Sequence, residues 1–123
     1  MPTANMADLA EIAPIQVFDG IRARRVEGDQ VTLAIVELDP GAVVPEHVHP
    51  HEQNGMVITG EMRFRVGSEE RLLGPGGTWR ILGGIEHSAV AGPDGAVVID
   101  VFSPIRVDWN DRAVLAPSAP RWP

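Results

Sequence analysis

The sequence contains no cysteine. Disulfide bonds, thiolate ligands, iron–sulfur clusters and cysteine nucleophiles are therefore excluded. Basic runs are also missing, because no run of lysine or arginine exceeds the pair Arg24–Arg25, and the net charge is −7. An acidic surface repels phosphate groups, so we expect neither a nucleic-acid partner nor binding to an anionic membrane surface.

Long apolar runs are absent as well. No segment approaches the roughly 20 apolar residues that a membrane-spanning helix needs. Residues 1–15 lack a basic start followed by a continuous apolar stretch, so we expect no signal peptide. A soluble protein of the cytoplasm is the resulting expectation.

The residues that are present favour one small all-β domain. The 123 residues include 44% hydrophobic residues, enough for one core, and 13 glycines and 11 prolines spread along the chain. Breakers at such spacing suit short strands joined by tight turns. We expect one domain over residues 1–123, with its core at about residues 30–109 and irregular tails at both ends.

Local patterns locate the strands. Residues 31–38 are rich in β-branched side chains, and residues 61–66 alternate strictly, with Met62 and Phe64 on one face. Gly60 suggests a tight connection between a strand at residues 55–59 and that alternating run. Residues 5–12 could form one helical turn. Further turns are predicted at residues 74–77, 83–84 and 92–95, leading into strands at residues 78–82, about 87–90 and 96–102.

Three of the four histidines lie within five residues: His47, His49 and His51. On an extended strand, His47 and His49 point to the same face. Two adjacent imidazoles form a ready pair of nitrogen ligands for a metal. Taken alone, a His-x-His pair could equally be a solvated, pH-sensitive loop.

The wider spacing favours the metal site. Gly41, five residues, His47, one residue, His49, three residues, Gln53, six residues and Gly60 resemble the first sequence motif of the cupin family. Gln53 stands where that motif usually has glutamate. The resemblance implies an all-β, single-domain cupin, which is a double-stranded β-helix or jelly-roll barrel, with one divalent metal ion.

A second stretch resembles the second cupin motif. It runs from Gly76 over five residues to Leu82, then through two glycines and two further residues to His87. Leu82 replaces the usual proline, and Ala91 the usual asparagine. Two motifs in the right order imply that His87 joins the first-motif ligands.

The fourth ligand has three candidates. Period two alone would include His51, but Pro50 is expected to bend the strand there, and Glu52 is chemically a better ligand than an amide. The spacing from His49 and to Gly60 selects Gln53. Neutral imidazole and amide donors suit Ni, Zn, Fe, Mn or Co and leave the ion its full double charge, with open positions for water or substrate.

A buried acid follows in the next predicted strand. Both faces of residues 97–102 are apolar around Asp100. An unpaired carboxylate there would be costly. Asp100 therefore either bonds a neighbouring strand or serves as a proton-transfer group in the barrel lumen. Arg106, beside Asp108, is either solvated or clamps a carboxylate through two parallel hydrogen bonds.

A narrower resemblance joins these two regions. His-x-His-Pro-His-Glu-Gln, followed by Asp-Val-Phe-Ser-Pro-x-Arg-x-Asp, is similar to small cupins of the KdgF type, over about residues 41–109. Such proteins act in pectin and alginate breakdown, where they convert cyclic 4,5-unsaturated monouronates into linear 4-deoxy-5-keto uronates. The resemblance implies catalysis by Asp100 and a substrate site formed by Phe102 and Arg106. The implied metal ligands are His47, His49, Gln53 and His87.

The resemblance thus implies a metal-dependent, isomerase-like enzyme acting on a small carboxylated sugar. The alternatives are a cupin dioxygenase, another metal-dependent isomerase or lyase on a small carboxylated substrate, and a non-catalytic sugar-binding cupin. Because small cupins leave an exposed sheet edge and an apolar outer face, we also expect a homodimer, with residues 31–38 contributing to that face.

Overall fold

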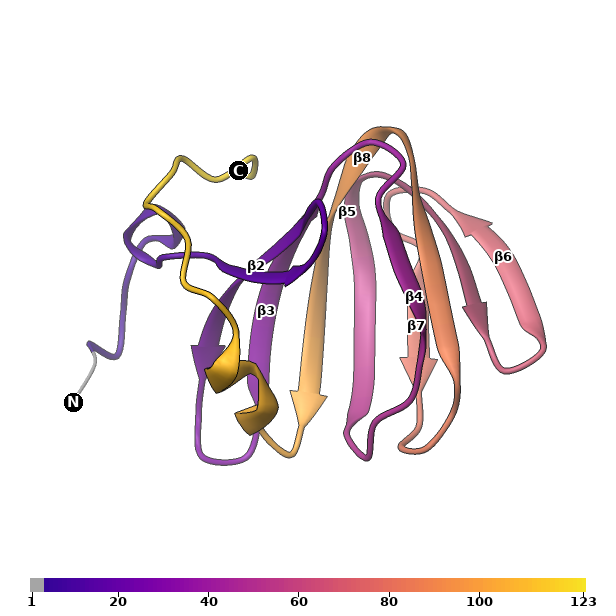
Figure 1. Cartoon of the computed structure of the whole chain (residues 1–123), viewed down its shortest axis with the longest axis horizontal. Helices are drawn as coiled ribbons and strands as arrows, with labels where there is room; N and C mark the ends of the chain where they lie inside the picture. The colour runs from indigo at the N-terminus through magenta and orange to yellow at the C-terminus, as the bar shows by residue number, and fades with distance from the viewer. Residues whose placement is uncertain (1–3) are drawn as a thin grey trace.

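Two long antiparallel strands form the centre of the structure. In this computed structural model, which describes residues 4–123, β5 (Glu52–Val66) pairs with β8 (His87–Ser103) from end to end, with two shifts in register. Six shorter strands complete the sheet (Figure 1). They are β1 (Ile15–Phe18), β2 (Ile21–Glu27), β3 (Thr32–Leu38), β4 (Val43–His47), β6 (Glu69–Leu73) and β7 (Thr78–Ile81). The first three residues of the predicted domain lie outside the described residues.

The shorter strands add to the two long ones in separate halves. The second half of β8 pairs with β3, which continues into β2 and β1, and the first half of β5 pairs with β7. In the other halves, β4 pairs with β8 and β6 pairs with β5. Each long strand therefore belongs to two sheet regions, which enclose one core as a barrel. The predicted all-β fold is confirmed.

Glycines allow the two long strands to bend. Gly60 has a φ of +78° and Gly95 a φ of +75°, a region that residues with a side chain rarely adopt. The register shifts here, because Gly60 pairs with Ala96 while Met62 pairs with Ala91. The predicted tight connection at Gly60 is wrong, because β5 continues through this position. The predicted turn at residues 92–95 falls inside β8, where these four residues pair with no residue of β5 and bulge out between two paired stretches.

The barrel begins earlier in the chain than predicted. Residues before position 30 were expected to be an irregular tail, yet β1 and β2 pair with each other and β2 pairs with β3. Ile15, Ile21 and Ala23 are buried in the same core as Met62 and the other inward side chains. The alternation of apolar and polar residues in this segment is too weak to predict these strands, because arginines interrupt the apolar positions.

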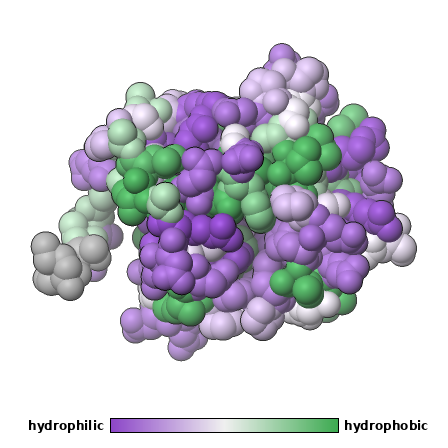
Figure 2. All heavy atoms as spheres, viewed as in Figure 1, coloured by the Kyte–Doolittle hydropathy of each residue, from purple (hydrophilic) through white to green (hydrophobic). Residues whose placement is uncertain are grey.

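In the described part of the chain, helical structure is limited to two short 3₁₀ turns, η1 (Leu9–Glu11) and η2 (Val107–Asp111). The first falls inside the helical turn predicted at residues 5–12. Among residues 4–123, no helix is long and apolar enough to cross a membrane. On the face seen in Figure 2, hydrophobic residues form separate patches within a largely hydrophilic surface.

A buried ion pair fastens the C-terminal tail to the outside of the barrel. Arg24 and Glu37 face away from the core on β2 and β3, are almost fully buried, and lie 2.8 Å apart. Arg24 also donates to the backbone oxygen and the hydroxyl of Ser118, and the backbone N–H of Arg121 donates to Glu37. The tail after η2 therefore lies against β2, as Figure 1 shows.

Candidate metal centre

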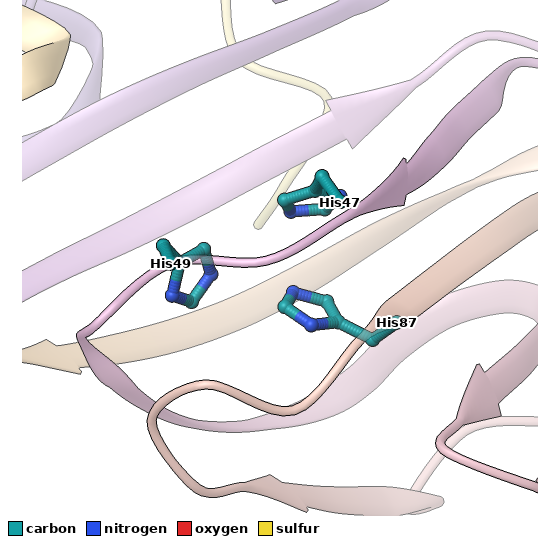
Figure 3. A group of neighbouring side chains, drawn as sticks. All are labelled: His47, His49 and His87. Atoms are coloured by element: carbon teal, nitrogen blue, oxygen red, sulfur yellow. The ribbon is translucent and has the colours of Figure 1, made fainter.

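Three histidines converge where β4 meets β8. His47 is the last residue of β4 and pairs directly with His87, the first residue of β8. His49 follows two residues later, on the loop that crosses to β5. Their ligand nitrogens all lie within 4.8 Å of one another, and Figure 3 shows the three rings turned toward a common space. The geometry can therefore hold one metal ion.

Backbone carbonyl groups fix the orientation of each ring. In His47, Nδ1 lies 2.7 Å from the carbonyl oxygen of Pro45. In His49, Nδ1 lies 3.0 Å from the carbonyl oxygen of His51, and in His87, Nδ1 lies 2.9 Å from the carbonyl oxygen of Ile85. A carbonyl oxygen only accepts hydrogen bonds, so each Nδ1 carries the hydrogen and each Nε2 offers a lone pair. This arrangement is typical of metal-ligating histidines.

Two observations fit a cation between these groups. The Nε2 atom of His87 is buried and has no hydrogen-bond partner within residues 4–123. The Nε2 atom of His49 lies 3.1 Å from the side-chain oxygen of Gln53. Both atoms of that second pair are acceptors in the tautomer described above. Two facing lone pairs are unfavourable by themselves and become favourable around a positive ion.

Burial keeps the rings of His49 and His87 neutral and ready to bind. It lowers the pKa of His49 to about 4, with the charges of Arg106 and His87 acting in the same direction. Burial is also the main cause that lowers the pKa of His87. Because metal ligands must be deprotonated, little proton release is needed at neutral pH.

The other two candidates for the fourth ligand point elsewhere. His51 is buried, but its Nε2 faces Asp108 at 3.8 Å, and it lies outside the group of three histidines. Glu52 is exposed at the start of β5, where alternation turns Gln53 inward. Gln53 is thus the candidate nearest to the histidines, and its role as a ligand stays a prediction.

Asp100 shares the lumen with these residues. One of its oxygens, Oδ1, accepts hydrogen bonds from the Gln53 amide at 2.9 Å and from the Trp79 indole at 2.8 Å. Burial raises the pKa of this carboxyl to about 6, although both hydrogen bonds and the charge of Arg106 oppose the shift. The hydrogen bonds to neighbouring strands are thus confirmed. Asp100 also lines the cavity, and its role in proton transfer stays a prediction.

Arg106 lies at the same cavity and is held on several sides. Its guanidinium carbon is 4.6 Å from the centre of the Phe102 ring and 4.5 Å from that of Trp109. Its Nε and Nη2 atoms donate to the two oxygens of Asp108, at 3.0 and 2.9 Å. The Nε and Nη2 edge of the guanidinium is therefore already bonded to Asp108, and the Nη1 side remains for the carboxylate of a ligand.

The cavity has a volume of about 310 Å³. Its walls are mainly apolar side chains of the barrel, together with a smaller number of polar groups. It is lined by the three histidines and by Gln53, Asp100, Phe102, Arg106 and Trp109, among others. Such a concave, largely apolar site with a few polar groups is the usual form of a small-molecule site.

Sequence reasoning missed Trp79 and the role of Asp108. Trp79 lies on β7, far in sequence from Asp100, and nothing in its own surroundings indicates a polar partner. A signal was present in Gly55, since a glycine inside a strand often marks a close approach of other groups. Asp108 had been noted as a neighbour of Arg106, but the bidentate pairing depends on η2.

The chain resembles known proteins of one family in sequence and in fold. The cupin domain family matches residues 34–102. The pectin degradation protein KdgF of Dickeya dadantii is 30% identical over 96 residues, which cover 76% of this chain and 87% of that protein. The solved structure of KdgF from Halomonas sp. aligns with a TM-score of 0.79 and 32% identity, over 86% of this chain and 98% of the other.

A more distant structure agrees in fold alone. An RmlC-like cupin from Shewanella frigidimarina aligns with a TM-score of 0.81 and 24% identity, over 87% of this chain and 96% of that chain.

Proposed function

The chain belongs to the cupin family and is a homologue of the pectin degradation protein KdgF, and we therefore propose that it converts cyclic 4,5-unsaturated monouronates into linear 4-deoxy-5-keto uronates. The observation that carries the proposal is the shared cavity. A buried carboxyl, three histidines able to hold a metal and an immobilised guanidinium all line it. The reaction is an isomerisation, so no redox partner or second substrate is needed.

Substrate binding is assigned to Arg106. The substrate carries a carboxylate, and the Nη1 side of the guanidinium points away from the pairing with Asp108. The rings of Phe102 and Trp109, whose centres are 5.1 Å apart, both contact the guanidinium and hold it in place. A charged donor fixed in this way loses little conformational freedom when it binds a carboxylate.

Proton transfer is assigned to Asp100. It takes the proton of the anomeric hydroxyl as the bond between C1 and the ring oxygen breaks, and the electron pair of that bond stays on the oxygen. The resulting enolate accepts a proton at C4 from Asp100, which yields the ketone at C5. Because the pKa of Asp100 is raised to about 6, the group can both take up and release a proton near neutral pH.

The metal has a separate role in the proposal. His47, His49, Gln53 and His87 would hold one divalent ion, Ni, Zn, Fe, Mn or Co, and this ion would supply Lewis-acid chemistry when bound. Chelation should therefore lower the rate without altering how the substrate carboxylate is bound.

The test uses unsaturated galacturonate and its mannuronate or guluronate counterpart. Protein stripped by chelator and reloaded with each of the five metals is incubated with either sugar, and the ultraviolet absorbance of the conjugated enol ether is followed. We expect a faster loss than without protein, and Asp100→Ala should retain metal but lose the acceleration. If no metal form exceeds the spontaneous rate, or if Asp100→Ala matches wild type, the proposal is wrong.

The alternatives give different results in the same samples. A dioxygenase would consume dissolved oxygen, which an oxygen electrode records, whereas the proposed isomerisation leaves oxygen constant. A sugar-binding cupin would bind the sugar in calorimetry and leave its absorbance unchanged beyond the spontaneous rate.

A further inference from the structure

A row of three residues crosses three neighbouring strands beside the cavity. On the central strand β5, Gly55 pairs with Trp79 of β7 on one side and with Asp100 of β8 on the other. Adjacent strands lie about 4.8 Å apart, so the backbones of the outer two residues are about 10 Å apart across the sheet. Their side chains nevertheless meet, because the indole reaches across the position where a side chain of residue 55 would stand.

The absence of a side chain at Gly55 makes this contact possible. A methyl group built there would lie 2.5 Å from Oδ1 of Asp100 and closer still to Nε1 of Trp79. Neither group could stay where it is. The glycine thus leaves space for one hydrogen bond, 2.8 Å long, from the indole to the carboxyl.

That hydrogen bond ends on the same oxygen as the one from Gln53. Oδ1 of Asp100 accepts both, at 2.9 Å from the amide and 2.8 Å from the indole. The carboxyl group is therefore held by two donors on one oxygen, and neither bond uses Oδ2. Rotation about the bond to the carboxyl carbon would break both.

We propose that Trp79 is a positioning residue, which holds Oδ1 of Asp100 so that Oδ2 is the oxygen presented to the reacting sugar. The proposal rests on the proposed function, because it assumes that Asp100 transfers the proton. Trp79 itself touches neither the sugar nor the metal in this assignment. Gly55 contributes by leaving the space that this hydrogen bond occupies.

The kinetic test is Trp79→Phe, which keeps most of the aromatic surface and removes the N–H. We expect kcat to fall by about 10–100-fold, as for other supporting residues of active sites, with KM and metal content within about twofold of wild type. The matched control is Trp122→Phe, in the tail, which should leave kcat unchanged. Equal kcat for the two variants, or a loss explained by metal release or a higher KM, would overturn the proposal.

A measurement without substrate tests the hydrogen bond itself. In ¹⁵N-labelled protein the three tryptophans give three indole signals, and the signal of Trp79 is the one lost in Trp79→Phe. Its N–H should exchange slowly with solvent in wild type and about tenfold or more faster in Asp100→Ala. If exchange is unchanged in Asp100→Ala, the carboxyl does not hold the indole and the inference fails.

The two arms separate the proposals. If wild type does not accelerate ring opening, the proposed function fails, and the exchange measurement alone decides whether Trp79 holds Asp100. If Trp79→Phe does not fold, Gly55→Ala tests the same hydrogen bond, because its new methyl group would displace the indole, the carboxyl or both. Its kcat should fall at least as far, and a wild-type kcat in Gly55→Ala would contradict the inference.

Discussion

Replacing Asp100 by asparagine should remove activity and make the metal-free protein more stable at neutral pH. Asparagine has the same shape, and its side-chain oxygen can accept the two hydrogen bonds from Gln53 and Trp79. It carries no charge, so it avoids the cost of ionising a carboxyl in a buried place. A group that is unfavourable for folding is expected at a catalytic position.

The magnitude follows from the pKa of the carboxyl. Burial raises the pKa of Asp100 from 3.8 to about 6. A difference of about two units corresponds to about 3 kcal/mol of unfolding free energy. Below about pH 3 the carboxyl is protonated in both states and costs nothing. Between about pH 4 and pH 6 the unfolded chain loses the proton first, so the wild type becomes less stable relative to Asp100→Asn, and above about pH 6 the difference is constant.

The assay is urea unfolding of both proteins in chelator at several pH values, followed by circular dichroism. The difference in unfolding free energy should be near zero at about pH 3 and rise to about 3 kcal/mol in favour of Asp100→Asn at pH 7–8. A difference that does not grow with pH, or a less stable variant at pH 8, would refute the reasoning, because the charge of Arg106 would then outweigh burial.

Three further changes test the site and the fold. His87→Ala should abolish tight metal binding, measured by metal content after dialysis, while a protein that keeps a full equivalent of metal would contradict the ligand set. Glu37→Gln leaves the buried charge of Arg24 without its partner and should lower the unfolding free energy by about 3–5 kcal/mol in urea. A loss below about 1 kcal/mol would mean that the pair is screened by water. Gly60→Ala should cost at least about 1–3 kcal/mol in the same assay, because φ is positive and the new methyl group meets Gly95, whereas an unchanged midpoint would show that the bulge can relax.

The metal centre was the part most accessible to sequence reasoning. Ligand spacing is a local property: His47 and His49 are two residues apart on extended chain, and the spacing to Gln53 is fixed by the short loop into β5. The distance of His87 from these residues could not be derived from the chain between them. It came from a family resemblance, and the structure explains it by the direct pairing of His47 with His87.

The bends in the long strands were not predictable in the same way. A glycine between two apolar runs favours a turn, and Gly60 and residues 92–95 were interpreted so. Whether such a glycine ends a strand or bends it depends on the partner strand. Here β5 continues through Gly60, whereas residues 92–95 of β8 pair with no residue of β5, and the pairing resumes on both sides. That information lies in the pairing and in neither segment alone.

The surroundings of Asp100 and Arg106 show the same limit. A buried acid could be predicted from the apolar neighbours of Asp100, but its donors come from β5 and β7. The pairing of Arg106 with Asp108 depends on the turn of η2, and a free arginine and a clamped one have the same sequence neighbours. Burial of a charged residue is thus easier to predict than the identity of its partner.

The anchoring of the C-terminal tail outside the barrel has a consequence for how such a protein could diversify. Asp100, which is assigned to ring opening, lies on a strand, whereas Arg106 and Trp109 belong to one contiguous stretch after β8. The far end of this stretch is fixed by the hydrogen bonds of Ser118 and Arg121. That stretch could be exchanged for another of similar length, grafted between two fixed ends, while the barrel and its histidines stay intact. New sugar preferences would then arise by replacing a single short segment.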